Sequence, residues 1–554
     1  MKNITCKHSH IIAILVSYAI TQGLLLVVDG IWWDDWCGYD TYVGGYGIGF
    51  AWNRALDYGR PLSILNYHIN LLPFQSYRFL VFIYFLFINL ILYEIVKHVT
   101  GNEDKALFIT IIFCIFPVFD CRMMRCIYSY SISYFEFAIA SYLMLVREDK
   151  ADGEGGLKYI SRRFLIVGLY FLSFNTSSFL VFFFIPLGLF LYNRCNRLEN
   201  SNVKDIINVV KKNVYFILTP FLYWMVKSVF FAPRGVHGDA GYNAVTSSGL
   251  FAAIIQSLYS PCVALHELAN NFLNRMPYVK GAFNIFAFLA ITYGLISFII
   301  KIILKEIHFK TDIKRLLIGL LFGYICTACG MFPYIAVRGN VWNMRMGVGS
   351  GGRDLMLTAL GLSIMVYYLA DFLFRKKGLA VFSVMACSFS CVYFFVFYTN
   401  YQTDSYWQYA LSEQFKQNQE LRTMNNLLLI DEWVSPLGLP EFYELNGLGY
   451  LAYGNRTRLI FLDNEIWLLD SEDKYYYKDT NYWMSEYDAS QSDIDAIVCF
   501  NCPISTAETV KLKFLQMFDQ EEYSLRMRNM GRFSYRIIDK AESDKIIFQS
   551  KGGG

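Results

Sequence analysis

Long apolar runs separated by short polar stretches dominate the first 400 residues of the chain. A transmembrane helix needs about 20 predominantly apolar residues, and about eleven segments meet or approach that length. We expect spans at about 11–29, 77–96, 106–118, 127–146, 163–176, 178–193, 213–231, 281–300, 316–336, 354–374 and 379–398. The segments 163–176 and 178–193 are short and meet at Asn175-Thr176-Ser177-Ser178. They therefore form either a tight hairpin or one broken element.

After residue 399 the apolar runs shorten and polar residues increase. The pattern predicts a helix near 404–424, strands at 427–430, 459–462 and 496–500, and an alternating pair near 523–538. We expect a membrane domain over 1–398, a mixed α/β domain over 399–550, and a tail over 551–554 that takes no part in the fold. No motif in the α/β domain carries chemistry by itself, so we expect it to position an acceptor or seal a cavity.

Composition agrees with a polytopic α-helical membrane protein. Charged residues make up 17% of the chain, against about 25% in soluble proteins, and the mean hydropathy is +0.33. The net charge of +3 is small, and no separate block of basic residues indicates a nucleic-acid partner. The first apolar segment runs into Trp32-Trp33-Asp34-Asp35 instead of a small-residue cleavage site, so we interpret it as an uncleaved signal anchor.

Basic residues give the orientation, because cytoplasmic loops are enriched in Lys and Arg. With a cytoplasmic N-terminus, the inside segments carry 22 Lys and Arg residues and the outside loops carry ten. The inside segments are 1–10, 97–105, 147–163, 193–212, 301–315 and 375–378. The predicted topology places the α/β domain outside the cytoplasm, together with the long loops 30–76 and 232–280.

The loop 30–76 begins with Trp32-Trp33-Asp34-Asp35-Trp36, directly after the first span. Acids at this depth are costly when they face lipid, and they commonly line a water-filled functional cavity. The tryptophans alone would fit an ordinary membrane interface. Residues 51–62 have helix-like periodicity that ends at Gly59 and Pro61, which predicts short interfacial helices. Arg60 adds a positive charge to the same loop as the acidic pair.

Other outside loops add charges. Asp120 lies in the next outside turn, where it either serves a site or pairs with a neighbouring arginine as a membrane-end cap. Three arginines, Arg338, Arg345 and Arg353, lie outside among glycines and need a countercharge. Phosphate fits guanidinium groups and exposed backbone amides, and lipid headgroups are the alternative. The apolar stretch 250–268 predicts an amphipathic helix along the interface.

The acidic pair Asp34-Asp35-Trp36 followed by Gly59-Arg60-Pro61-Leu62 resembles the motifs of GT-C class glycosyltransferases, in particular the bacterial enzymes that build or modify surface polysaccharides. The similarity of pattern covers about the first 230 residues. It implies a GT-C-like membrane domain in the bacterial cytoplasmic (inner) membrane. The implied reaction moves a sugar from a polyprenyl-phosphate-linked donor to an extracytoplasmic glycan or lipid-linked glycan, with inversion at the anomeric carbon.

The resemblance also implies roles for residues. Asp34 would be the general base, because a hydroxyl acceptor needs one within hydrogen-bond reach, and Asp35 would orient Asp34, the acceptor or a metal. Asp120 would be a supporting acid. Four arginines would bind the phosphate of the donor and stabilise its charge as it leaves, without protonating it. They are Arg60, Arg338, Arg345 and Arg353. Two alternatives stay open: a divalent cation, Mg or Mn, held by Asp34, Asp35 and Asp120, and a reaction that needs no metal.

Three alternatives remain at this point. A polysaccharide polymerase or O-antigen ligase also uses outside arginines and lipid-linked substrates, but its chemistry does not rest on an acidic pair after the first span. A lipid-linked-glycan transporter would have ionisable residues near mid-span and two similar halves. A scaffold would leave the outside acids and arginines without a common purpose.

Overall fold

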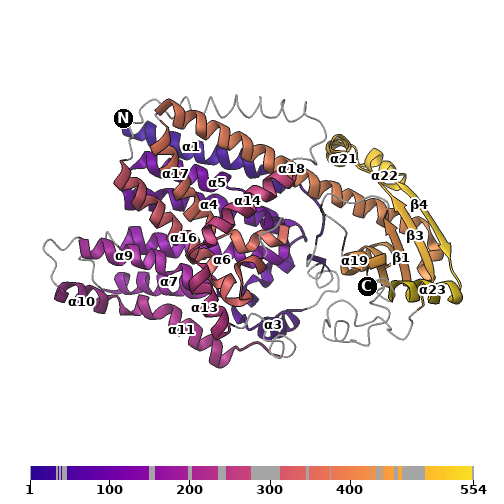
Figure 1. Ribbon diagram of the computed structural model, residues 1–554, viewed down its shortest axis with the longest axis horizontal. Helices are drawn as coiled ribbons and strands as arrows, with labels where there is room; N and C mark the ends of the chain where they lie inside the picture. The colour runs from indigo at the N-terminus through magenta and orange to yellow at the C-terminus, as the bar shows by residue number, and fades with distance from the viewer. Residues whose placement is uncertain are drawn as a thin grey trace. The chain divides into compact units, whose positions relative to one another are not determined.

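The computed structural model describes residues 2–551 except for 33–34, 37–38, 40–46, 149–155, 197–202, 235–244, 276–311, 345–348, 375, 425, 432–436, 438–439, 441, 455–458 and 465–492. The chain forms two compact units, which we describe separately (Figure 1). The membrane unit comprises Met1–Val27, Gly47–Met276 and Gly281–Phe395. The α/β unit comprises Val28–Tyr46, Pro277–Lys280 and Val396–Gly554.

Apolar helices build the membrane unit. The expected spans fall on helical structure, apart from 281–300, which lies outside the described residues. These helices are α1 (Lys2–Gln22) with η1 (Gly23–Leu26), α4 (Ser76–Thr100), α5 (Glu103–Ile115), α6 (Tyr128–Tyr142) with η5 (Leu143–Glu148), α7 (Leu157–Ser173), α8 (Phe179–Phe182), α9 (Phe184–Asn196), α11 (Val214–Phe230), α16 (Ile313–Arg338), α17 (Thr358–Leu373) and the start of α18 (Lys376–Gln417). Outside these spans, the helix α10 (Val203–Lys212) precedes α11.

Three helical stretches in the described part of the chain are long and apolar enough to cross a membrane: Ser9–Leu26, Ser76–Thr100 and Ile313–Arg338. Shorter apolar helices accompany them. The protein is therefore a helical membrane protein with a small sheet, as the sequence predicts, and the count of eleven spans stays a prediction.

The segments 163–176 and 178–193 form a hairpin. Near the turn the rings of Tyr170 and Phe183 pack edge to face at 4.6 Å. At the other end, the buried Glu148 carboxylate accepts hydrogen bonds from Arg162 (3.0 Å) and Arg163 (2.6 Å) at the start of α7. Arg194 near the end of α9 donates to the Glu148 carbonyl at 2.7 Å. The two helices therefore lie antiparallel.

Two loop regions of the membrane unit are helical. The predicted helices of the first outside loop are confirmed as α3 (Ile48–Asp57) and the 3-10 helix η2 (Pro61–Leu71). The single interfacial helix expected over 250–268 is wrong in detail. Two helices, α13 (Ser247–Gln256) and α14 (Ser260–Arg275), cover it, and they bend by 78° at the break between them, which fits a broken span or a re-entrant loop.

The α/β unit contains a four-stranded sheet in the order β2-β1-β3-β4. The strands β1 (Asn426–Asp431), β2 (Leu459–Leu462) and β3 (Ala496–Asn501) are parallel and were predicted from sequence. β4 (Arg532–Ile537) pairs antiparallel with β3. In the central strands, successive residues such as Leu427, Leu428 and Leu429 are all buried, as expected for parallel strands covered on both faces.

The alternating pair predicted over 523–538 is only half correct. Its second half is β4, but its first half lies in helix α22 (Gln520–Arg528). Asp519 caps this helix by accepting a hydrogen bond from the amide of Glu522 at 3.1 Å. The capping residue and the acids of the first turn favour a helix over the weak alternation of apolar residues.

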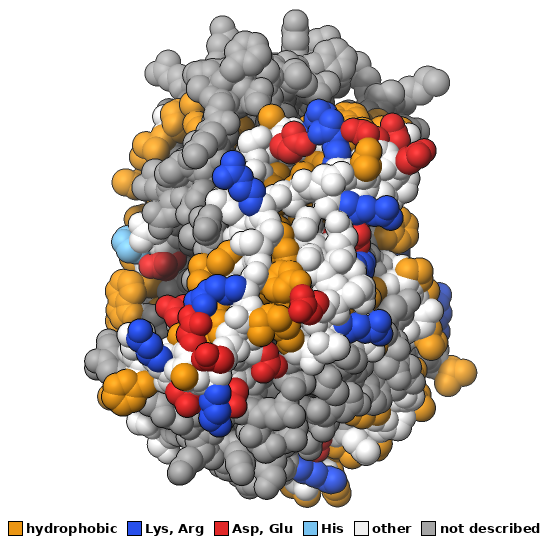
Figure 2. All heavy atoms as spheres, turned by 90° about the vertical axis from the view of Figure 1, so that its right-hand side faces the viewer, with side chains coloured by type: hydrophobic (Ala, Val, Ile, Leu, Met, Phe, Trp, Pro, Cys, Tyr) orange, Lys and Arg blue, Asp and Glu red, His pale blue; other side chains and the backbone are white. Residues whose placement is uncertain are grey.

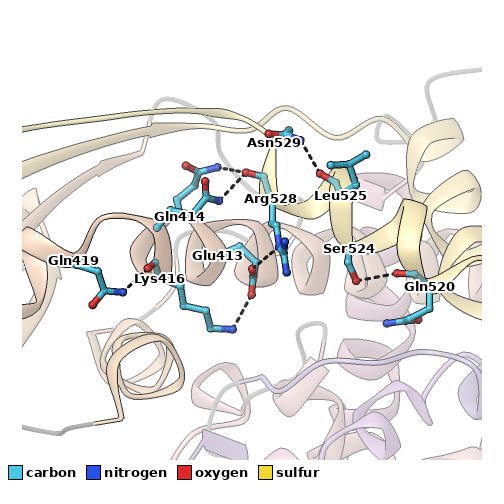
Figure 3. A network of polar contacts seen from close by, with 10 residues as sticks. Glu413, Gln414, Lys416, Gln419, Gln520, Ser524, Leu525, Arg528 and Asn529 are labelled. Carbon is cyan, nitrogen blue, oxygen red and sulfur yellow. Dashed lines mark hydrogen bonds and ion pairs between the residues drawn. The ribbon is translucent and has the colours of Figure 1, made fainter.

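Helix α18 continues to Gln417, so the predicted break between a span ending at 398 and a helix starting near 404 is wrong. Its last turns are fastened to α22 (Figure 3). Gln414 and Gln417 both donate to the Arg528 carbonyl at 2.9 Å, and the Glu413 carboxylate lies between Lys416 (2.7 Å) and Arg528 (3.9 Å). The change of composition near 399 therefore marks a change of surroundings along one helix.

Charges of both signs are interspersed with apolar side chains on the face of the molecule in Figure 2. In the α/β unit many exposed charges are paired, for example Arg536 with Glu542 (2.6 Å) and Lys540 with Asp493 (3.6 Å). The hydrogen bond from Arg536 lowers the pKa of the Glu542 carboxyl group. Two exposed arginines on one face of the edge strand β4, Arg532 and Arg536, discourage pairing with another chain.

The segment Val28–Tyr46, which contains the acidic pair, belongs to the α/β unit. The sequence-based division assigned it to the membrane domain 1–398, so the structure corrects that boundary. The physical reason is aromatic burial: the side chains of Trp32 and Trp36 are each 2% exposed, and they pack on α18 and α19 (Phe442–Tyr453). We call Val28–Tyr46 the acidic segment.

Candidate functional site

Four consecutive polar residues, 175–178, form the turn between α7 and α8, and we call them the serine turn. Each contacts a different element. Asn175 donates to Ser63 Oγ of η2 (3.0 Å), and Thr176 Oγ1 donates to Ser133 Oγ of α6 (3.0 Å). Ser177 Oγ accepts from Lys227 Nζ of α11 (2.9 Å), and Ser178 Oγ lies 3.3 Å from the Tyr334 hydroxyl of α16. The serine turn thus joins four elements through hydroxyl and amide groups, of which those of Asn175, Thr176 and Ser178 are buried and that of Ser177 is half-buried.

A pair of cations lies beside this turn. Arg60 and Lys227 are half-buried. The chain at Gly59 passes against the Phe231 carbonyl at the end of α11, which brings Arg60 near Lys227, and their positive charges repel each other. No carboxylate in the described part of the chain forms an ion pair with either side chain. Because unpaired cations are costly at the end of an apolar helix, this arrangement favours binding of an anion between or beside Arg60 and Lys227.

Gly59 places Arg60 at this position. Its φ of +62° is left-handed, and a Cβ atom there would lie 2.8 Å from the Phe231 carbonyl oxygen just after α11. The amide of Arg234 also donates to the Asp57 carbonyl at 3.1 Å. The chain between α3 and η2 therefore passes directly against the end of α11.

We expect Gly59→Ala to lower the free energy of unfolding by more than the 1–2 kcal/mol or so that a left-handed L-residue costs, because the new methyl group would press on a backbone oxygen. Thermal unfolding in detergent measures the change. Gly101→Ala is the matched control, since Gly101 has a φ of +65° and open space around its Cβ position. Equal losses in the two variants would contradict the close contact.

A second charged cluster lies at the end of α16. The fully buried Asp354 carboxylate is 3.3 Å from Arg338 Nε and 3.6 Å from Arg353 Nε. Arg353 and Asp354 belong to η9 (Gly349–Leu355), and the Arg353 carbonyl lies 3.4 Å from the Tyr334 hydroxyl. Through Tyr334 and the serine turn, this cluster is connected to Lys227. The two arginines and one acid carry a formal net charge of +1.

The predicted site residues have different outcomes. Asp34 and Arg345 lie outside the described residues, as does the side chain of Asp120, whose backbone begins η3 (Asp120–Met123). The structure brings Arg338 and Arg353 together on Asp354, and it places Arg60 beside Lys227. Asp35 is buried within the α/β unit.

The arginines that follow Asp120 have other partners. Arg122 is buried between the rings of Phe85 and Phe119 and donates to Gln22 at 2.6 Å. Arg125 donates to the carbonyl groups of Phe74 (3.0 Å) and Ile69 (3.2 Å). These two side chains therefore fasten the turn to α1, η2 and the segment before α4.

Sequence reasoning missed Lys227, Tyr334, Asp354 and the serine turn as site residues. Two of them carried a signal. A run of four polar residues between apolar segments is a poor lipid-facing turn, and Asp354 directly follows one of the arginines that needed a countercharge. Lys227 and Tyr334 become part of the site only through contacts between helices that are far apart in the sequence.

The described residues contain no group of three His, Cys, Asp or Glu side chains that could hold a metal ion. Asp34 and the side chain of Asp120 lie outside that search, so the predicted cation on Asp34, Asp35 and Asp120 stays a prediction. The anion-binding features of the membrane unit involve cations and hydroxyl groups, and they do not require a metal.

Comparison with known proteins identified no relative. No protein-family model, no curated protein and no solved structure matches this chain.

Proposed function

We propose that this protein is an integral-membrane glycosyltransferase of the GT-C type. It moves a sugar from a polyprenyl-phosphate-linked donor to a glycan or lipid-linked glycan outside the cytoplasm of a bacterium. Asp34 acts as the general base on the acceptor hydroxyl, and the cations of the membrane unit hold the phosphate of the donor.

The observation that carries the proposal is the pair Arg60 and Lys227 beside the serine turn. The residues around it come from the ends of η2, α7, α11 and α16 that the sequence predicts to be on one side of the membrane. A phosphate placed there would receive charge-assisted hydrogen bonds from Lys227 and Arg60. Its prenyl chain would remain among the apolar helices, which fits a lipid phosphate better than a free one.

Each group has a distinct part in the reaction. The acceptor hydroxyl loses its proton to Asp34 as its oxygen attacks the anomeric carbon, and the bond to the donor phosphate breaks on the opposite face. The leaving group is a phosphate monoester whose developing charge is stabilised by fixed cations. Arg338 and Arg353, held by Asp354, add positive potential on the side of the serine turn.

We expect Lys227→Met to weaken binding of polyprenyl phosphate by about tenfold to a hundredfold, the effect of losing a hydrogen bond to a charged group. Methionine keeps the length of the aliphatic chain. Native mass spectrometry of the protein in nanodiscs, titrated with polyprenyl phosphate, measures the affinity. Because the substitution also removes repulsion with Arg60, stability without ligand should not fall.

The matched control is Lys211→Met, which removes an exposed lysine of α10. Unchanged affinity in Lys227→Met, or an equal loss in the control, would remove the cation pair from the donor site. Retained binding of the lipid phosphate together with transfer that does not depend on Asp34 would favour the polymerase or ligase alternative.

A further inference from the structure

An exposed apolar stripe runs along α21 (Thr506–Phe518), a helix of the α/β unit. Its residues recur every three or four positions, so they share one face of the helix. Three of its side chains are large and strongly exposed: Phe514 by 61%, Met517 by 55% and Phe518 by 75%. We call the following exposed residues the α21 stripe: Ala507, Val510, Phe514, Met517 and Phe518.

The opposite face of α21 is fixed on the part of α18 that belongs to the α/β unit. Thr509 Oγ1 lies 2.6 Å from Thr403 Oγ1 of α18, and Gln516 accepts a hydrogen bond from the Tyr406 hydroxyl at 3.1 Å. Leu512, between these two contacts, is fully buried. Because the contacting residues lie on the other side of the helix from the α21 stripe, the apolar side chains point away from α18.

The contacts with α18 also give the level of α21 along that helix. The apolar run of α18 ends at Tyr398, where the sequence predicts that the span leaves the bilayer. Thr403 follows five residues later, which corresponds to about 7–8 Å along a helix. The headgroup layer on each side of the hydrocarbon core is itself roughly 5–8 Å thick. With the span ending at Tyr398, α21 lies at the level of the headgroups.

The residue types of this face fit a lipid surface. Neighbouring large apolar side chains on the surface of a protein commonly mark a site that contacts a membrane or another protein. Lys511 is exposed beside the α21 stripe, and a lysine can keep its methylene chain with the apolar face while its ammonium group reaches an anionic lipid phosphate. Apolar and aromatic residues on one side with a flanking lysine are typical of helices that lie in the membrane interface.

We propose that α21 is an interfacial anchor, whose α21 stripe is buried at the boundary between the headgroups and the acyl chains of the bilayer. The partner is the lipid surface itself. The anchor fastens the α/β unit to the membrane surface at a second point beside α18. This inference needs only a membrane protein, and it does not depend on the proposed sugar transfer.

Photo-crosslinking of the full-length protein tests the anchor. The photoreactive amino acid p-benzoylphenylalanine replaces Phe514 or Phe518, one at a time. Both positions are exposed and aromatic, so the fold tolerates the change. The protein is irradiated in the membranes of the producing cells and in nanodiscs of phosphatidylcholine and phosphatidylglycerol. We expect lipid adducts at both positions, with insertion into the acyl chains identified by mass spectrometry.

The matched control is Phe548 of α23 (Lys540–Lys551), whose side chain is 76% exposed. Ser543 of α23 accepts a hydrogen bond from the amide of Ile494 at 2.8 Å, so α23 lies near the start of β3, whereas α21 follows the end of that strand. Position 548 should therefore give no lipid adduct.

Three results would overturn the proposal. The first is the absence of lipid adducts at Phe514 and Phe518 in both membranes. The second is equal lipid labelling at Phe548, which would mean that any exposed position of the unit reaches lipid. The third is crosslinking of the two α21 positions to another protein or to a second copy of this chain in place of lipid.

Discussion

Replacing Asp34 with asparagine is expected to abolish sugar transfer, with kcat falling by roughly 10²–10⁴-fold, the usual contribution of a general base. Asparagine keeps the volume of the side chain and removes only its ability to accept a proton. Affinity for polyprenyl phosphate and expression should stay near wild type. The measurement is turnover of purified protein, with the donor sugar first identified by mass spectrometry of surface glycans from cells with and without the protein.

Two further carboxylate-to-amide changes make this result specific. Asp35→Asn should be milder than Asp34→Asn, because Asp35 orients the base and does not take the proton. Asp519→Asn should have no effect, since Asp519 is an exposed helix cap and asparagine caps helices equally well. Near-wild-type turnover in Asp34→Asn would show that the base is another group.

The second large effect is expected in stability. Asp354→Asn should lower the free energy of unfolding by about 3–5 kcal/mol, the cost of removing one partner from a buried ionic cluster. Its carboxylate is fully buried, and the side chains of Arg338 and Arg353 are 25% and 19% exposed. Without the acid, two mostly desolvated guanidinium groups would repel each other. Thermal and denaturant unfolding in detergent would measure the loss.

The control for this prediction is Asp312→Asn on the same helix, α16. Asp312 is exposed and caps the helix by accepting a hydrogen bond from the amide of Arg315 at 2.8 Å, a role that asparagine fills. A loss below about 1 kcal/mol in Asp354→Asn would mean that water or another group already compensates the two arginines.

Local pattern predicts much of the secondary structure of this chain. Apolar runs locate α4 and α16, and short β-branched or leucine-rich runs locate β1, β2 and β3. The same patterns fail where a change of composition does not coincide with the end of a helix or strand. Polarity rises near residue 399, but nothing in the sequence 399–404 breaks a helix, so α18 continues.

Site residues were harder to predict, because their roles depend on contacts between distant segments. Lys227 looks like an ordinary basic residue near the end of a span until Ser177 and Arg60 lie beside it. The partner of Asp29 is Lys513, almost the whole chain away. Trp36 is a residue type that is common at membrane interfaces. In the structure it is buried against Gly447, whose lack of a side chain leaves room for the indole ring.

The uninterrupted course of α18 fixes the rotational phase of its contacts within the α/β unit. The helix runs for 42 residues, about 63 Å at 1.5 Å per residue. Its residues Tyr401 and Gln414 contact Trp32 and Arg528, which all belong to the α/β unit. A residue added or removed between Tyr401 and Gln414 would turn Gln414 by about 100° around the helix axis, away from α22. Between these two contacts the helix therefore tolerates changes of length only near whole turns.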